Sequence, residues 1–248
     1  ISIFNFLDNY IANYGIIILL LTLIIKLLLL PLTYRSYKST AKMKVLKPQV
    51  DEITAKIPKD KPMERQQATM ALYKKAGVNP MGGCLPMLLQ MPILFAMFRF
   101  FPASIELRQK SFLWADDLSS YDSVLNLPFN IPFYGNHVSL FCLLMTISTI
   151  IYTRMQMQTQ TTSMPGMKVM MYMMPVMFLF FFNNYASGLS YYYLIANLFT
   201  FGQMYLFRRY VDEKALLEKI NQNQKKPVKK SKFQERLEKI AKERGYKR

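Results

Sequence analysis

The sequence predicts an all-α, polytopic membrane protein with five transmembrane helices and a helical hairpin on the cytoplasmic side. Two properties that conflict in a uniform chain indicate this fold class: 52% of the 248 residues are hydrophobic, yet the formal net charge is +17. The two are segregated along the chain, because apolar runs alternate with basic runs. Segregation of this kind is typical of a protein with one part in lipid and another in water.

Five apolar stretches approach the length of about 20 residues that a helix needs to cross a hydrocarbon core about 30 Å thick. They are residues 14–32, 82–101, 138–155, 167–185 and 189–207. The apolar character from 167 to 207 is too long for a single span. We therefore expect a tight reversal where Asn183-Asn184 and Ser187-Gly188 interrupt it.

Lysine and arginine are unequally divided between the connections, and this bias predicts the orientation. Residues 34–80 and the tail after Arg208 are rich in both, whereas residues 102–137 contain only Arg108 and Lys110 beside four acidic residues. We expect residues 34–80 and the C-terminus in the cytoplasm. The loop at 102–137 and the start of the chain are then on the periplasmic side.

Three regions follow from these spans. We expect an interfacial segment on the periplasmic side at 1–13, a five-span core at 14–210, and a basic cytoplasmic tail at 211–248. The tail is either a disordered chain that follows the positive-inside bias or a contact surface for an anionic partner. The aromatic loop at 102–137 is expected to lie along the outer membrane surface as an anchor.

The cytoplasmic segment at 34–80 has the pattern of two short helices. Leu46, Val50, Ile53 and Ile57 recur at helical spacing on one face. The proline-rich stretch at 58–62 then breaks the pattern before a second helix, and together they predict an antiparallel hairpin. A solvated structural role and a position on anionic lipid head groups both remain open.

Lys26 is the most informative residue, because a charge within a transmembrane helix costs about 2.5–3.5 kcal/mol on insertion scales. It lies six residues, about 9 Å, from the expected end of its span at Leu32. Thr22 lies one turn earlier on the same helical face. Either the ammonium reaches the interface by snorkelling, or it has a function inside the membrane.

Two glutamines support the functional interpretation. By the helical rise, Gln90 is about 12 Å and Gln203 about 8 Å from the cytoplasmic ends of their spans, a depth similar to that of Lys26. None of the spans offers an obvious carboxylate, so the ammonium needs water. The sequence predicts a wet cavity open to the cytoplasm and closed outside by apolar side chains. Hydrogen bonding between helices, without a cavity, is the alternative for each glutamine.

Enzyme chemistry is not expected. The chain has one histidine and two cysteines, and it lacks the recognised metal, nucleophile-elbow and phosphate-loop motifs. We therefore expect no cofactor, no metal site and no small-molecule substrate. The methionines around the fourth span, from Met164 to Met177, are either ordinary core and lipid contacts or an adaptable face for varied apolar segments.

Beyond these patterns, the sequence resembles the YidC family of membrane protein insertases over nearly the whole chain. The matching segments are residues 79–86, 90–93, 41–43, 71–73, 106–108, 174–176, 187–189, 192–193 and 197–198. The resemblance implies a five-helix core with a hydrophilic groove open to the cytoplasm and to lipid. It places Lys26 where the family has a groove arginine, and Ala186 where it usually has proline.

The resemblance also implies a function and partners. It implies insertion and folding of nascent membrane proteins in the bacterial inner membrane, alone or with the Sec translocon, with ribosome contact through the tail and contact with anionic lipids. The expected groove residues are Lys26, Thr22, Gln90, Gln203, Tyr192 and Tyr193. A channel or transporter using the same cavity, and a purely structural scaffold, are the alternatives.

Overall fold

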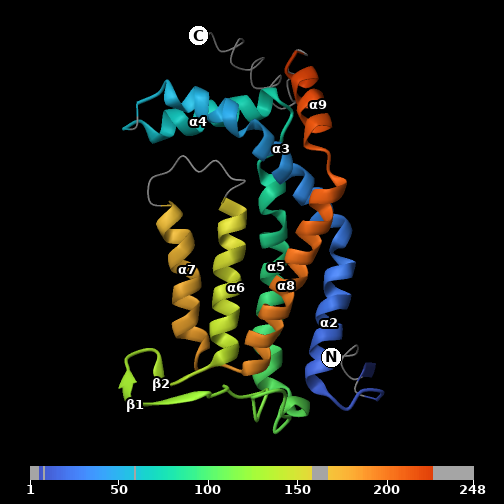
Figure 1. Ribbon diagram of the computed structural model, residues 1–248, viewed down its shortest axis with the longest axis vertical. Helices are drawn as coiled ribbons and strands as arrows, with labels where there is room; N and C mark the ends of the chain where they lie inside the picture. Colours follow the sequence, from blue (N-terminus) through green and yellow to red (C-terminus); the bar gives the residue numbers. More distant parts are fainter. Residues whose placement is uncertain (1–5, 8, 59, 158–166, 226–248) are drawn as a thin grey trace, which may run out of the picture.

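The computed structural model describes residues 6–7, 9–58, 60–157 and 167–225, with the backbone alone for residues 81, 84–87, 89, 167, 168 and 225. The described protein is mostly helical (Figure 1). Its longer elements are α2 (Tyr14–Leu28), α3 (Leu30–Ala55), α4 (Pro62–Lys75), α5 (Met81–Ala103), β1 (Leu125–Ile131), β2 (Gly135–Val138), α6 (Leu140–Met157), α7 (Met167–Phe182), α8 (Ser187–Tyr210) and α9 (Glu213–Lys225).

Helix α8 is the centre of the arrangement. It packs against α2, α5 and α6, while α7 packs against α6 at the side of the bundle (Figure 1). Helices α3, α4 and α9 lie at the upper end in this view, and the two strands lie at the lower end. Helices α2, α5, α6, α7 and α8 lie within or overlap the five predicted apolar stretches, and the reversal predicted near Asn183 separates α7 from α8.

The first helix ends earlier than the sequence suggested. Helix α2 stops at Leu28 rather than at Leu32, and α3 begins at Leu30 with its axis bent by 61° from that of α2. Pro31 explains the break, because it has no amide hydrogen to donate and its ring clashes with the carbonyl four residues earlier. Lys26 therefore lies in the last turn of α2.

The described helices differ in how well they meet the requirements of a membrane span. Among the described residues, α6 is by itself long and apolar enough to cross a membrane. The bent pair α2–α3 meets the same requirement if it is counted as one broken span, and Val169–Phe182 is apolar but shorter. Helix α8 has 24 residues, but its serine, tyrosine, asparagine, threonine and glutamine residues lower its hydropathy. The count of five spans stays a prediction.

At the upper end, α3 and α4 pack side by side and share an apolar core with α9. Met43, Leu46 and Val50 of α3 contact Tyr73 of α4 and Ile220 of α9 in this core. Gly82 and Gly83 let α5 approach α3 closely, since a Cβ atom at Gly82 would lie 2.8 Å from the Cβ atom of Ser39. The hairpin helices are thus fixed both to the bundle and to the first part of the tail.

The loop at 102–137 contains a β-hairpin that the all-α prediction missed. Strand β1 pairs antiparallel with β2, with Leu125 opposite Val138 and Ile131 opposite Gly135. The segment from Leu125 to Ile131 alternates apolar and polar residues, which is the period of a strand, although Pro128 interrupts it. Both strands are short and lie at the lower end of the helices (Figure 1).

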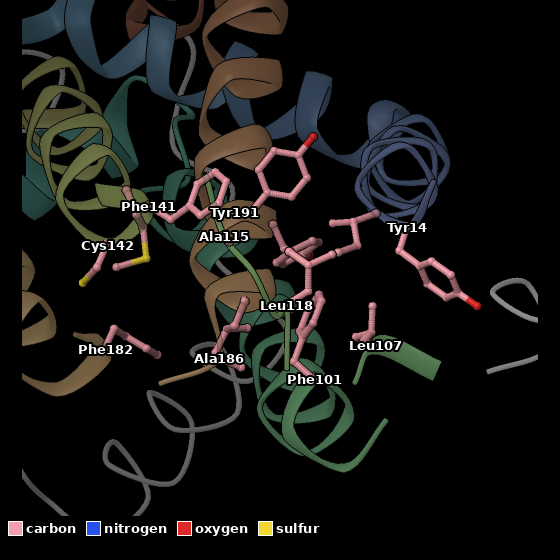
Figure 2. Packing of buried hydrophobic residues seen from close by; sticks show 14 of the residues in the cluster. Tyr14, Phe101, Leu107, Ala115, Leu118, Phe141, Cys142, Phe182, Ala186 and Tyr191 are labelled. Carbon is pink, nitrogen blue, oxygen red and sulfur yellow. The ribbon is translucent and has the colours of Figure 1, made fainter. Parts of the chain in front are cut away.

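The main hydrophobic core occupies the lower half of the bundle. Figure 2 shows Phe101, Leu118, Phe141, Ala186 and Tyr191 converging from α5, the loop at 102–137, α6, the α7–α8 reversal and α8 itself. Ile17, Ile18 and Leu21 of α2 join them. Leu7 and Ile11, from the segment predicted to be interfacial, also pack against this core.

Candidate functional site

A row of polar side chains follows one side of α8 above the main core. We call it the polar seam, and it consists of Tyr192, Tyr193, Asn197, Thr200 and Gln203. From Tyr193 onward its members recur every three or four residues, so they share one face of the helix. This face meets α2, α5 and α6, which makes it the place where polar groups gather inside the bundle.

Lys26 belongs to the upper part of this seam. Its Nζ donates a hydrogen bond to Oγ1 of Thr200 at 2.9 Å, and that hydroxyl donates to the backbone oxygen of Ala196 at 2.7 Å. Lys26 forms no ion pair with an acidic side chain among the described residues. Its position in the last turn of α2 partly compensates, because the carbonyl end of a helix favours a cation.

Gln203 and Thr22 have different relations to Lys26. The amide nitrogen of Gln203 donates to the backbone oxygen of Lys26 at 3.4 Å, while its Oε1 is buried and has no partner within the described part of the chain. Thr22 is buried, and its hydroxyl donates to the backbone oxygen of Ile18 at 2.7 Å. Gln203 therefore contacts the lysine segment directly, whereas Thr22 bonds within its own helix.

Gln90 lies in a second, deeper tier. Its side chain hydrogen-bonds both Tyr192 and Tyr193 of α8. Seven residues of helix, about 11 Å, separate Tyr193 from Thr200, the partner of Lys26. The three polar groups predicted at one depth thus form two tiers, one with Lys26, Thr200 and Gln203 and one with Gln90 and the tyrosines.

Sequence reasoning missed two members of the seam. Thr200 accepts the hydrogen bond from Lys26, and Asn197 donates to Oγ of Ser148 at 2.9 Å and to Oγ1 of Thr149 at 3.0 Å on α6. The signal was present, because Asn197 and Thr200 precede Gln203 by six and three residues on the same helical face. The seam therefore extends from the side of α2 to the side of α6.

The two ends of the seam have opposite chemistry. At its lower end, Tyr192 is buried and adjoins Phe101 and Leu189, which belong to the main core. Above it, the side chains are polar and one of them is cationic. An ammonium with a hydroxyl partner and no carboxylate is free to attract an acidic group that arrives from the upper end. The arrangement therefore places one cation among polar side chains at the upper end of the seam, above a packed apolar core.

A separate cavity lies on α4 of the α3–α4 hairpin and on the loop that follows it. Its volume is about 630 Å³, and its lining consists of Gln67, Met70, Ala71, Lys74, Gly77, Val78, Asn79 and Pro80. The α4 residues of this lining are spaced as one helical face, which combines an apolar floor with a lysine. The basic run that follows Lys225 lies outside the described residues, as does Met164.

Comparison with known proteins gives consistent results. The sequence profile of the family described as "60Kd inner membrane protein" matches residues 6–215. The membrane protein insertase YidC of Parabacteroides distasonis is 59% identical over 246 residues, which is 96% of this chain and 39% of that protein. The YidC of Amoebophilus asiaticus is 51% identical and is matched by 100% of this chain, over 42% of its own length.

The fold has a relative among solved structures. A crystal structure of an active YidC insertase, with its first transmembrane domain resolved, superposes with a TM-score of 0.58 and 31% sequence identity. The match covers 80% of this chain and 43% of that one. The chain thus spans about two fifths of the length of the curated relatives that it matches.

Proposed function

This chain belongs to the 60Kd inner membrane protein family, and we propose that it inserts nascent membrane proteins into the bacterial inner membrane and helps them fold. The relatives named above are called membrane protein insertases, which supports this function. Within the chain, the supporting observation is the asymmetry of the bundle: polar above and packed with apolar side chains below.

We place five helices across the membrane: α2, α5, α6, α7 and α8. The upper end with the α3–α4 hairpin and α9 is then cytoplasmic, and the lower end with the β-hairpin is periplasmic (Figure 1). The Lys/Arg bias of the connections supports this orientation. In this proposal residues 1–13 lie at the periplasmic interface, residues 14–210 form the core, and residues 211–248 are cytoplasmic.

The polar seam is the proposed substrate groove. Lys26 and Gln203 attract the hydrophilic or acidic flank of a client at the cytoplasmic entrance, and Gln90 with Tyr192 and Tyr193 forms the floor of the groove. Thr22 lies on the same helix as Lys26, and its hydroxyl donates a hydrogen bond to the backbone oxygen of Ile18 within α2. Drawing the flank partway across shortens the polar distance that it must cross, because the apolar core occupies the rest of the bundle.

No covalent step is needed for this reaction. Burial of the apolar client segment in lipid supplies the free energy, at about 25 cal/mol for each Å² removed from water. The exposed apolar side chains of α7, among them Met170, Met173 and Met177, are a suitable face along which that segment moves into the bilayer. Their flexibility fits clients of varied sequence.

The proposed partners follow from charge and position. Nascent membrane proteins are the clients, the hairpin receives them, and the Sec translocon cooperates for some of them. The basic tail contacts the ribosome through its phosphates, and lysines near the membrane contact anionic lipids. The cavity on α4 lies in the part of the hairpin that first meets a client.

Variants at Lys26 test the function directly, in proteoliposomes with matched protein levels. We expect Lys26→Ala and Lys26→Glu to lose most insertion of a client with an acidic flank, because both remove the positive charge. Lys26→Arg should keep insertion, because arginine shares the positive charge of lysine although its geometry differs. Thr200→Val removes the hydroxyl but keeps the charge, so its loss should be smaller. Full activity of Lys26→Ala would remove the lysine from the mechanism.

A further inference from the structure

The β1–β2 hairpin is built differently from a hairpin that faces water. No aspartate, glutamate, lysine or arginine occurs between Asp122 and Arg154. Its exposed side chains are instead large and apolar: Phe133 is 92% exposed, Phe129 is 60% exposed, and Val124 and Leu125 are also exposed. Edge strands in water usually carry charged side chains that prevent aggregation, and this hairpin has none.

The turn of the hairpin adds a second anomaly. The amide of Tyr134 donates to the backbone oxygen of Ile131 at 3.1 Å, and Pro132 and Phe133 occupy the two central positions of this turn. Phe133 has a φ angle of 67°, which is the type II turn position normally taken by glycine. A bulky residue is strained there and gains nothing from the protein, because its ring is exposed. A strained aromatic side chain is explained if its ring enters an apolar phase.

The hairpin is held firmly to the end of α7. The Asn183 side chain donates to the backbone oxygens of Tyr134 and His137, both at 2.9 Å, and Asn184 donates to Tyr134 at 2.8 Å. The ring of Tyr134 packs edge-on against Phe180 of α7, with 5.6 Å between centroids. The depth of the hairpin in any membrane is therefore fixed by α7.

Exposed apolar side chains lie on both sides of this junction. Phe181 and Met177 of α7 are exposed, and they lie on the helix that ends at the hairpin. Figure 1 shows the hairpin turn projecting beyond the lower end of α7, outside the outline of the helices. The turn thus faces the surroundings of α7 and not the interior of the bundle.

We propose that the hairpin turn inserts Phe129 and Phe133 into the interfacial layer of the outer lipid leaflet, where it anchors the lower end of α7. This inference rests on the membrane placement proposed above. Lipid is the occupant that the observations favour, because aromatic rings with nearby asparagine and backbone groups suit the head-group boundary. The lack of aspartate, glutamate, lysine and arginine in the β1–β2 hairpin also fits contact with lipid.

Spin-label depth measurements in phosphatidylcholine vesicles test this anchor. Nitroxides are placed by Phe133→Cys and Phe129→Cys in a chain carrying Cys84→Ala and Cys142→Ala, with Met177→Cys as the lipid reference and Asp116→Cys as the water reference. We expect both hairpin labels to lie between the two references and nearer to the label at 177, because the proposal places them in the interfacial layer. Their ratio of collisions with oxygen to collisions with a water-soluble nickel complex should be several-fold above that of the label at 116.

A backbone-preserving variant sharpens the test. Phe133→Gly suits the turn and removes the ring, so the label at 129 should move toward the water reference while circular dichroism is unchanged. A label at 133 as accessible to nickel as that at 116 would overturn the proposal, and so would a label shielded from both reagents, which indicates a protein contact. The measurement uses no client, so loss of insertion leaves it unaffected.

Discussion

Asp122 shows how one side chain fixes the start of a helix. Its buried carboxylate accepts hydrogen bonds from the amides of Leu140 and Phe141 at 2.9 and 3.1 Å, from Nε1 of Trp114 at 3.0 Å, and from the hydroxyl of Ser139. It thereby caps the first turn of α6, where the helix dipole also favours an anion.

We predict that Asp122→Ala lowers the free energy of unfolding by about 3 kcal/mol, because it leaves several buried donors without an acceptor. Chemical denaturation in detergent, followed by the near-ultraviolet circular dichroism of Trp114, measures the change. Asp116→Ala is the matched control, since Asp116 is exposed on the same loop. Equal stability of the two variants would show that the cap is dispensable.

At this scale, the sequence identified side chains that are unfavourable inside a membrane and missed the residues that form hydrogen bonds with them. Lys26 was conspicuous because a charge in an apolar run is expensive. Thr200 was not, because a threonine in a span is cheap and common, and only the structure shows that it accepts the bond from Lys26. Gln90 was found by type, but its depth relative to Lys26 depends on how α5 and α8 pack.

Helix α9 packs the first part of the tail against the α3–α4 hairpin. Ile220 is 2% exposed in the hairpin core, and Lys44 of α3 pairs with Glu213 at 2.6 Å. Like charges oppose this docking: burial lowers the pKa of Lys42, and the nearby Lys38 and Lys219 lower it further. The apolar contact therefore holds α9 in place against a repulsive background.

We predict that Ile220→Asp releases α9 from the hairpin. Placing a carboxylate in the core should speed amide hydrogen exchange in Glu213–Lys225 about a hundredfold, equivalent to about 3 kcal/mol. Leu217→Asp is the control on the same helix, because Leu217 is 37% exposed. Unchanged exchange in Ile220→Asp would mean that the polar contacts alone hold α9.

Prediction of the elements succeeded where periodicity was strong. The long apolar stretches and the reversal at Asn183 correspond to helices and a turn in the structure. The break at Leu29 was placed too late, because the residues around Pro31 are as apolar as the span before them. The β-hairpin was missed because its alternation is short and Pro128 weakens a strand assignment.

For the whole molecule, the packed lower core leads to a test that separates the proposed insertase groove from a channel. We predict that single cysteines at positions 26 and 203 react with a membrane-impermeant thiol reagent added on the cytoplasmic side and not with reagent added outside. The reason is that Phe101, Leu118 and Leu189 fill the bundle below the seam. Cys84 and Cys142 are replaced by alanine in this experiment.

The same labelling provides its own reference. A cysteine at the exposed Asp116 should react only from outside, which checks vesicle integrity and orientation. Reaction at position 26 from both sides would indicate a continuous aqueous path and would favour the channel or transporter alternative. Reaction from neither side would indicate a dry interior, with the polar seam serving only to join the helices.

The docking of α9 also determines when the core of the α3–α4 hairpin can be completed during translation. Gln224 of α9 donates to Gln49 of α3 across 175 residues of chain, so the hairpin core stays incomplete until the end of that stretch has been translated. At about 5–20 residues per second, the delay is roughly 10–35 s. During this interval the faces of Leu46 and Val50 that α9 later covers are open to chaperones. The newborn protein thus passes through a stage in which it resembles one of its own proposed clients.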